Sequence, residues 1–273
     1  MSTQSDNNAV ADSVIVTGKQ LLDTEWQIDL KNAAITRNLL EAGDLVKRAP
    51  EIYENLGGVM CLLSLLASCH WGCRGGDHDV ENLVRRCCNY AFSALSLARL
   101  GFYDESLALI RGVAEVANLL ELFAIDREQL RRWKALPDKE RRRQYSPAHV
   151  RIMIEENGKE VAADEETYSS LCELGIHVTP ESMRTSHQHN GQVHIGACFS
   201  VMGFLVALNE LAINVSPVVI FAGYLLNVPK EKIDEFREAC NTLRSSCTMY
   251  ARAANYQELM KEMQARVNPA SSE

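Results

Sequence analysis

Helical spacing that recurs from end to end is the feature that most restricts the fold of this chain. Apolar residues stand three or four positions apart through successive segments, and each segment is bounded by residues that start or stop helices. Asp79 and Asp126 are placed as N-caps, and Gly101 directly follows the segment 80–100. The sequence shows no sustained strand alternation between turn signals. It therefore predicts an all-α protein.

These segments predict a helical bundle of about eight or nine helices with a single core. We expect the segments 55–68, 80–100, 103–124 and 195–227 to form the centre of that core. Residues 18–267 are expected to form the helical domain, between a disordered polar arm at 1–17 and a disordered tail at 268–273. The expected helices are 19–48, 50–70, 80–100, 103–124, 127–136, 147–157, 164–174, 195–227 and 229–266.

The composition is typical of an intracellular protein with a sizeable core. The chain has 273 residues, of which 47% are hydrophobic, so it can bury a core without disulfides. Its formal net charge of −8 argues against a dedicated nucleic-acid-binding protein, because neutralising phosphates requires surplus Lys and Arg, and we expect no DNA partner. The polar N-terminus does not resemble a signal peptide. The nine cysteines mostly lie in apolar runs, as Cys61 does, which favours buried, reduced thiols in a cytoplasm.

The apolar segment 195–228 is the best candidate for a membrane span. Asn209 and Glu210 interrupt it near its middle. A carboxylate at that depth would be costly in a bilayer, which needs about 20 apolar residues for one span. We therefore predict a buried core helix and no membrane partner.

The segment 229–266 carries an apolar stripe with alternating spacings of three and four residues. Such a stripe is covered either by the chain's own core or by a helix of another copy. Because other segments already supply a long core, the sequence favours a homo-oligomer, most simply a homodimer, through this helix. The stripe consists of Ile233, Phe236, Cys240, Leu243, Cys247, Tyr250 and Ala254.

Arg111 and Glu115 are the most prominent charges within an otherwise apolar helix. Their spacing of four residues places them on one face of that helix. If this face is buried, the two charges must pair or bind something, because an unpaired buried charge is expensive. Either a core ion pair or a functional site satisfies that requirement.

Two clusters, one of cysteines and histidines and one of histidines alone, have side chains that zinc accepts. The first lies between Cys69 and His78, and the second, in the loop 177–194, holds four of the seven histidines. The first cluster lacks the usual spacing of a structural zinc site, and few carboxylates accompany the second. We therefore expect no metal and no cofactor, and keep a metal-dependent hydrolase on the histidine-rich loop as an alternative.

Two motifs resemble those of a bacterial all-helical family of unknown function that is itself similar to the HEPN group. The family pairs an L-L-R-x-x-x-E helix with a later Y-x-x-L-S-x-x-x-H segment. On that resemblance Arg111, Glu115, Tyr168 and His177 are the matching positions. Cys172 stands where the family has serine, and the histidine falls one position late.

The resemblance implies a pocket in which Arg111, Glu115 and His177 lie within about 10 Å of one another, lined also by Tyr168. HEPN ribonucleases carry an arginine and a histidine separated by four to six residues and cleave RNA without a metal. Arg184 and His189 have that spacing here. The resemblance thus implies RNA as a partner, and this expectation rests on the resemblance alone.

Three functions remain open from the sequence. The first is a cytoplasmic helical interaction module that self-associates. The second is a HEPN-like, metal-independent ribonuclease or toxin-type effector of the kind found in phage defence. The third is the metal-dependent hydrolase. The sequence leaves open whether the chain is an enzyme.

Overall fold

The computed structural model describes residues 18–42, 48–71, 78–177, 196–247 and 252–255. Within these ranges the chain forms ten α-helices, two short 3-10 turns and no strand, which confirms the all-α prediction. The expected arm at 1–17 and the tail at 268–273 lie outside the described residues. The helices are α1 (Gly18–Ala42), α2 (Ala49–Ala67), α3 (Asp79–Leu100), α4 (Tyr103–Ile125), α5 (Arg127–Ala135), α6 (Asp138–Gln144), α7 (Pro147–Glu156), α8 (Glu165–Gly175), α9 (Val201–Leu225) and α10 (Lys230–Ser246).

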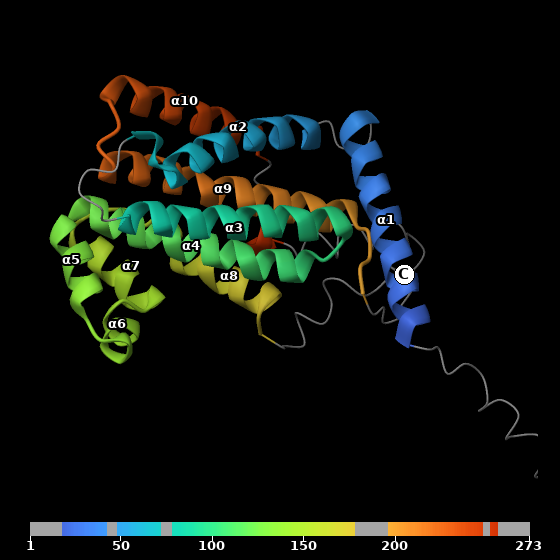
Figure 1. Ribbon diagram of the computed structural model, residues 1–273, viewed down its shortest axis with the longest axis horizontal. Helices are drawn as coiled ribbons and strands as arrows, with labels where there is room; N and C mark the ends of the chain where they lie inside the picture. The colour runs from blue at the N-terminus through green and yellow to red at the C-terminus, as the bar shows by residue number, and fades with distance from the viewer. Residues whose placement is uncertain (1–17, 43–47, 72–77, 178–195, 248–251, 256–273) are drawn as a thin grey trace, which may run out of the picture.

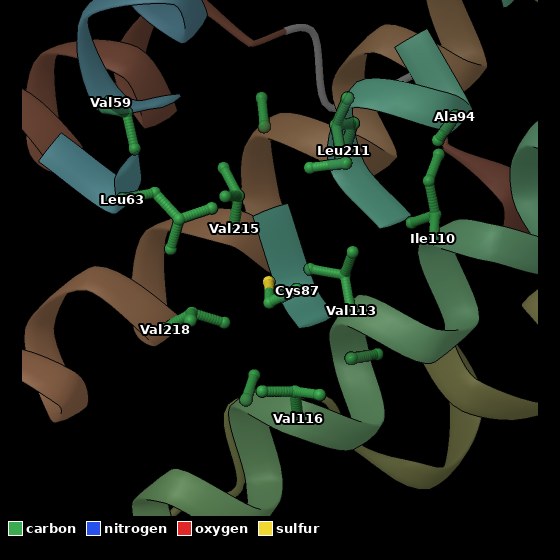
Figure 2. Close-up of a cluster of buried hydrophobic side chains, with 14 of the residues drawn as sticks. Val59, Leu63, Cys87, Ala94, Ile110, Val113, Val116, Leu211, Val215 and Val218 are labelled. Carbon is green, nitrogen blue, oxygen red and sulfur yellow. The ribbon is translucent and has the colours of Figure 1, made fainter. Parts of the chain in front are cut away.

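The core is built around α4, which packs most extensively against α9 and α3. Helix α2 covers the other side of α3 and α9, so the four segments expected at the centre do form it (Figure 1). Their buried side chains are mainly branched aliphatic ones. In Figure 2, Val113 of α4, Cys87 of α3 and Val215 of α9 extend into one shared cluster. A single core therefore joins these helices.

Helix α9 is the segment that raised the question of a membrane. It begins at Val201 rather than 195, where the Ser200 side chain accepts a hydrogen bond from the backbone N–H of Gly203. By length and composition it could cross a bilayer, and it is the one such helix in the described part of the chain. Most of its residues are buried inside the bundle. This burial is what the prediction of a core helix requires.

Helix α6 was not expected from the sequence, which shows only a run of mixed charges there. Its arginines lie in its last turn, where cations interact favourably with the helix dipole. Arg141 also turns back toward α5, donating 2.8 and 2.6 Å hydrogen bonds to the carbonyls of Trp133 and Leu136. These bonds satisfy carbonyl groups at the C-terminal end of α5. Local hydrogen bonding, rather than apolar periodicity, accounts for α6.

The C-terminal helix is shorter than expected, and its stripe is covered. Helix α10 ends at Ser246, and Cys247 is extended, so the helix does not continue toward 266. Ile233, Phe236 and Leu243 are buried in a helix that packs on α2 and α9. The chain's own core thus covers the stripe residues from Ile233 to Cys247, so this part of the stripe needs no second copy to cover it. Ala254 lies beyond α10 and is exposed. Tyr250 lies outside the described residues.

Eight of the nine cysteines are described, and all eight are free thiols. Five are buried, as expected for cysteines in apolar runs, but Cys61 and Cys69 are exposed. The expectation for Cys61 was wrong because α2 is apolar around much of its circumference and turns that position away from the core. Burial raises the pKa of Cys88 and of Cys240 to about 11, so these thiols stay protonated at neutral pH.

Candidate functional site

A polar centre joins α4 to α8, and it contains three of the residues expected to form a site. The guanidinium of Arg111 lies 2.7 Å from Oε1 of Glu115, one turn along α4. The hydroxyl of Tyr168, on α8, donates a 2.9 Å hydrogen bond to the same carboxylate oxygen. One carboxylate therefore holds both an arginine of its own helix and a tyrosine of the neighbouring helix. The structure brings these three residues together.

A second arginine, which no sequence pattern indicated, completes this centre. Arg151 of α7 lies with its guanidinium 4.9 Å from the centre of the Tyr168 ring, while that of Arg111 lies 5.5 Å from the same ring. Arg151 is almost fully buried and pairs with the exposed carboxylate of Glu165 at the start of α8. Nothing in the sequence marked this residue, because a single arginine in a short amphipathic helix is typical of a solvated face.

The charges of the polar centre fix its protonation states. Burial raises the pKa of Tyr168, and the negative charge of Glu115 raises it further. Burial lowers the pKa of Arg111, but Glu115, Tyr168 and Cys172 together outweigh that effect, and the pKa is raised. At neutral pH the tyrosine is therefore a neutral hydrogen-bond donor and the arginine stays charged. In this state the tyrosine cannot serve as a general base.

The remaining site candidates are not part of the polar centre as described. His177 follows α8, and its backbone N–H donates a hydrogen bond to the carbonyl of Cys172. His177 is exposed to solvent. Arg184 and His189 lie outside the described residues, as does most of the histidine-rich loop. The expected approach of His177 to Arg111 within about 10 Å therefore remains a prediction.

Within the described part of the chain, no group of three or more His, Cys, Asp or Glu side chains could hold a metal ion. Of the cluster between Cys69 and His78, the two end residues do approach each other, with Sγ 3.7 Å from Nδ1. His78 also lies 3.9 Å from Glu81. Cys73 lies outside the described residues.

The polar centre has the features of a structural network. Every side chain in it bonds or stacks across the α4, α7 and α8 junction, and α8 packs closely on α4. Two nitrogens, Nε of Arg111 and Nη1 of Arg151, are buried and have no hydrogen-bond partner among the described residues. Their burial means that a ligand could reach them only if side chains moved.

A second surface, on α1, has the opposite character, because it is apolar and open. Leu22, Trp26 and Leu30 are 69%, 64% and 54% exposed, and they stand four residues apart. Figure 1 shows α1 across one end of the bundle, with its N-terminal half extending away from α2 and α3. We call these three residues the α1 stripe. A contiguous exposed apolar row of this kind is a candidate interaction surface.

The other side of α1 holds it to the bundle. The amide of Asn32 donates a 2.9 Å hydrogen bond to the carbonyl of Leu100, and the hydroxyl of Thr36 donates an equally long one to the carbonyl of Arg99. Leu39 is buried on this face. Helix α1 thus has two separate faces, one for its own core and one directed to solvent. The signal was present in the sequence, since its apolar residues form two rows rather than one.

Next to the α1 stripe, a pocket of about 560 Å³ opens between α1, α2 and α3. Arg99 of α3 lies in it, with its guanidinium 5.2 Å from the centre of the Tyr53 ring and bonded to the hydroxyl of that tyrosine. The pocket is lined by Ala33, Thr36, Arg37, Leu40, Glu41, Tyr53, Ser96, Arg99 and Leu100.

Comparison with known proteins adds no further constraint on the site. No protein-family model matches the chain, and no curated protein or solved structure shows detectable similarity to it.

Proposed function

We propose that the chain is a cytoplasmic helical interaction module that self-associates through α1. The observation that carries this proposal is the α1 stripe, in which three large apolar side chains are each more than half exposed. Singly exposed apolar residues are ordinary, whereas a contiguous row on one helix face favours burial against another helix. Self-association was also expected from the sequence, through the C-terminal helix, and the exposed residues of α1 support α1 as the surface that we propose instead.

Light scattering on the purified chain across nanomolar to micromolar concentrations tests this function. We expect the mass to rise from one copy to two as the concentration increases, and the double variant Leu22→Ser/Leu30→Ser to remain monomeric. Phe92→Ser is the matched control. Phe92 is also about half exposed, but it lies on α3 and is not part of the α1 stripe. A monomer at every concentration would overturn the proposal.

A HEPN-like ribonuclease is the second candidate function. It is favoured by one observation, the convergence of Arg111, Glu115 and Tyr168, which are the residues that the family resemblance singles out. Incubation with RNA, with and without EDTA, separates the alternatives. Cleavage that EDTA does not affect supports the ribonuclease, hydrolysis that EDTA abolishes supports the metal-dependent hydrolase, and absence of cleavage excludes both on the RNA tested.

A further inference from the structure

The α1 stripe leads directly into the pocket between α1, α2 and α3. Continuing from Leu30 at spacings of three or four residues, the same face of α1 carries Ala33, Arg37 and Leu40, and all three line the pocket. One end of this face is therefore a raised apolar row, and the other end is the wall of a cavity. A surface with a projection at one end and a recess at the other can be complementary to itself.

We propose that two copies of the chain pair through antiparallel α1 helices, with Trp26 of each copy seated in the pocket of the other. This arrangement rests on the proposed function. In a two-fold symmetric dimer, if one residue contacts a second across the interface, the reciprocal contact also exists. One antiparallel register then fills both pockets at once, so no complementary surface is left to recruit a third copy.

The spacing along α1 fixes that register. When Trp26 lies level with the part of α1 between Ala33 and Arg37, the symmetry axis passes beside Leu30. The same register brings Leu22 level with position 38, between Arg37 and Leu40 at the far wall of the pocket. All three members of the stripe are then covered by the other copy, Leu30 by its own counterpart and Trp26 by the pocket.

The charges along α1 favour the antiparallel direction. Its N-terminal half carries Asp23 and Asp29 beside the stripe, whereas Arg37 lies on the half that forms the pocket. Antiparallel pairing places Asp23 of one copy beside Arg37 of the other, and parallel pairing would set like charges level with each other. The indole of Trp26 would also enter a pocket that holds Arg37, a cation that can stack on its face, together with Glu41 and the stacked pair of Arg99 and Tyr53.

The first test fills the pocket from α3 and leaves the sequence of α1 unchanged. Ser96→Phe places a ring in the pocket from α3 and should raise the dimer dissociation constant at least about tenfold, as should Trp26→Ala, because interface anchors of this kind dominate binding. Asn89→Phe is the matched control, since Asn89 is exposed on α3 two turns before Ser96 and outside the pocket. It should leave the dissociation constant unchanged.

A charge exchange tests the direction of pairing by the same light-scattering measurement. Asp23→Lys and Arg37→Glu should each weaken the dimer several-fold, and the double variant should regain it, because the two new charges then face each other across the antiparallel interface. In a parallel pair each residue would face its own counterpart, so like charges would face each other in the wild type and in every variant, and the exchanges would leave the dissociation constant nearly unchanged. Circular dichroism of each variant verifies that the helices are retained.

The possible failures are distinguishable. A wild-type chain that stays monomeric refutes both the function and this arrangement. A wild-type dimer that tolerates Trp26→Ala and Ser96→Phe refutes the arrangement alone, as does a double charge variant that fails to recover.

Discussion

The hydroxyl of Tyr168 donates a 2.9 Å hydrogen bond to Oε1 of Glu115, the oxygen that also pairs with Arg111. Because Tyr168 lies on α8 and Glu115 on α4, this bond fastens the short helix to the centre of the core. Arg151 stacks on the same tyrosine from α7. A single aromatic ring thus connects three helices that the chain supplies from separate segments.

Replacing the carboxylate of this network should cost stability. In Glu115→Gln the amide oxygen can still accept from Tyr168, but Arg111 loses the charge beside it. The side chains of the pair are 27% and 30% exposed. The cost should therefore fall between those of exposed and buried pairs, at about 1–2 kcal/mol in the free energy of unfolding measured with urea.

Glu160→Gln is the control for this variant, because Glu160 is an exposed carboxylate in the loop before α8. It should change the free energy of unfolding by no more than about 0.5 kcal/mol. If Glu115→Gln proves equally neutral and abolishes an activity or a binding event, the carboxylate is held for a ligand rather than for the fold.

Three of the four residues of this polar centre could be named from the sequence, Arg111 and Glu115 from their spacing and Tyr168 from the family resemblance. The pairing of Arg111 with Glu115 follows from a spacing of four residues on one helix, and such a spacing fixes proximity before any tertiary structure forms. The approach of Arg151 depends on how α7 and α8 fold back onto α4, which no local pattern encodes. Its partner Glu165 also lies in a first helical turn, where an acidic residue already has a local explanation in the helix dipole.

Stability should fall in alkaline solution, in part through Tyr168. Burial, together with the charge of Glu115, raises the pKa of this tyrosine above its ordinary value of 10.0. In the unfolded chain the phenol loses its proton near pH 10, whereas the folded chain keeps it, so the unfolded state binds fewer protons above that pH. The free energy of unfolding should therefore decline above about pH 10, by up to about 1.4 kcal/mol per pH unit for this group.

Tyr168→Phe isolates that contribution. The variant should be about 1 kcal/mol less stable near pH 7 because the hydrogen bond to Glu115 is lost, and its stability should decline less steeply than that of the wild type above about pH 10. Urea titrations at several pH values provide both quantities. Identical slopes for the two proteins would contradict the assignment.

The C-terminal stripe and the α1 stripe share one sequence pattern but differ in what covers them. In both segments the apolar residues stand three or four positions apart. This spacing predicts that one face of the helix will be covered, but not by what. For Phe236 on α10 the cover is the chain's own core, whereas Trp26 on α1 stays open. Which outcome holds depends on the path of the chain between helices, and neither stripe encodes that path.

The buried carboxylate of Glu210 should make its arginine partner costly to remove. Glu210 is 1% exposed on α9, and its Oε1 accepts a 2.7 Å hydrogen bond from Nε of Arg252 and a 2.8 Å one from the backbone N–H of Ala253. Arg252→Met leaves the carboxylate buried without its cation and should cost about 3–5 kcal/mol. Arg131→Met breaks an exposed pair with Glu128 and should cost at most about 1 kcal/mol. Equal losses in the two variants, measured with urea, would contradict the role assigned to burial.

The close approach of α8 to α4 leads to the last prediction. A Cβ built on Gly175, at the end of α8, would lie 2.5 Å from the backbone nitrogen of Ala108, and a backbone atom cannot move aside as a flexible side chain can. Gly175→Ala should therefore separate the two helices and lower the free energy of unfolding by about 1–3 kcal/mol. Gly57, inside α2, has open space where its Cβ would stand, and Gly57→Ala should raise stability by about 0.5–1 kcal/mol by restricting the unfolded chain. The two variants make the same chemical change, so opposite shifts in the urea midpoint would isolate the packing effect. Shifts of the same sign would show that α8 approaches α4 less closely than the structure indicates.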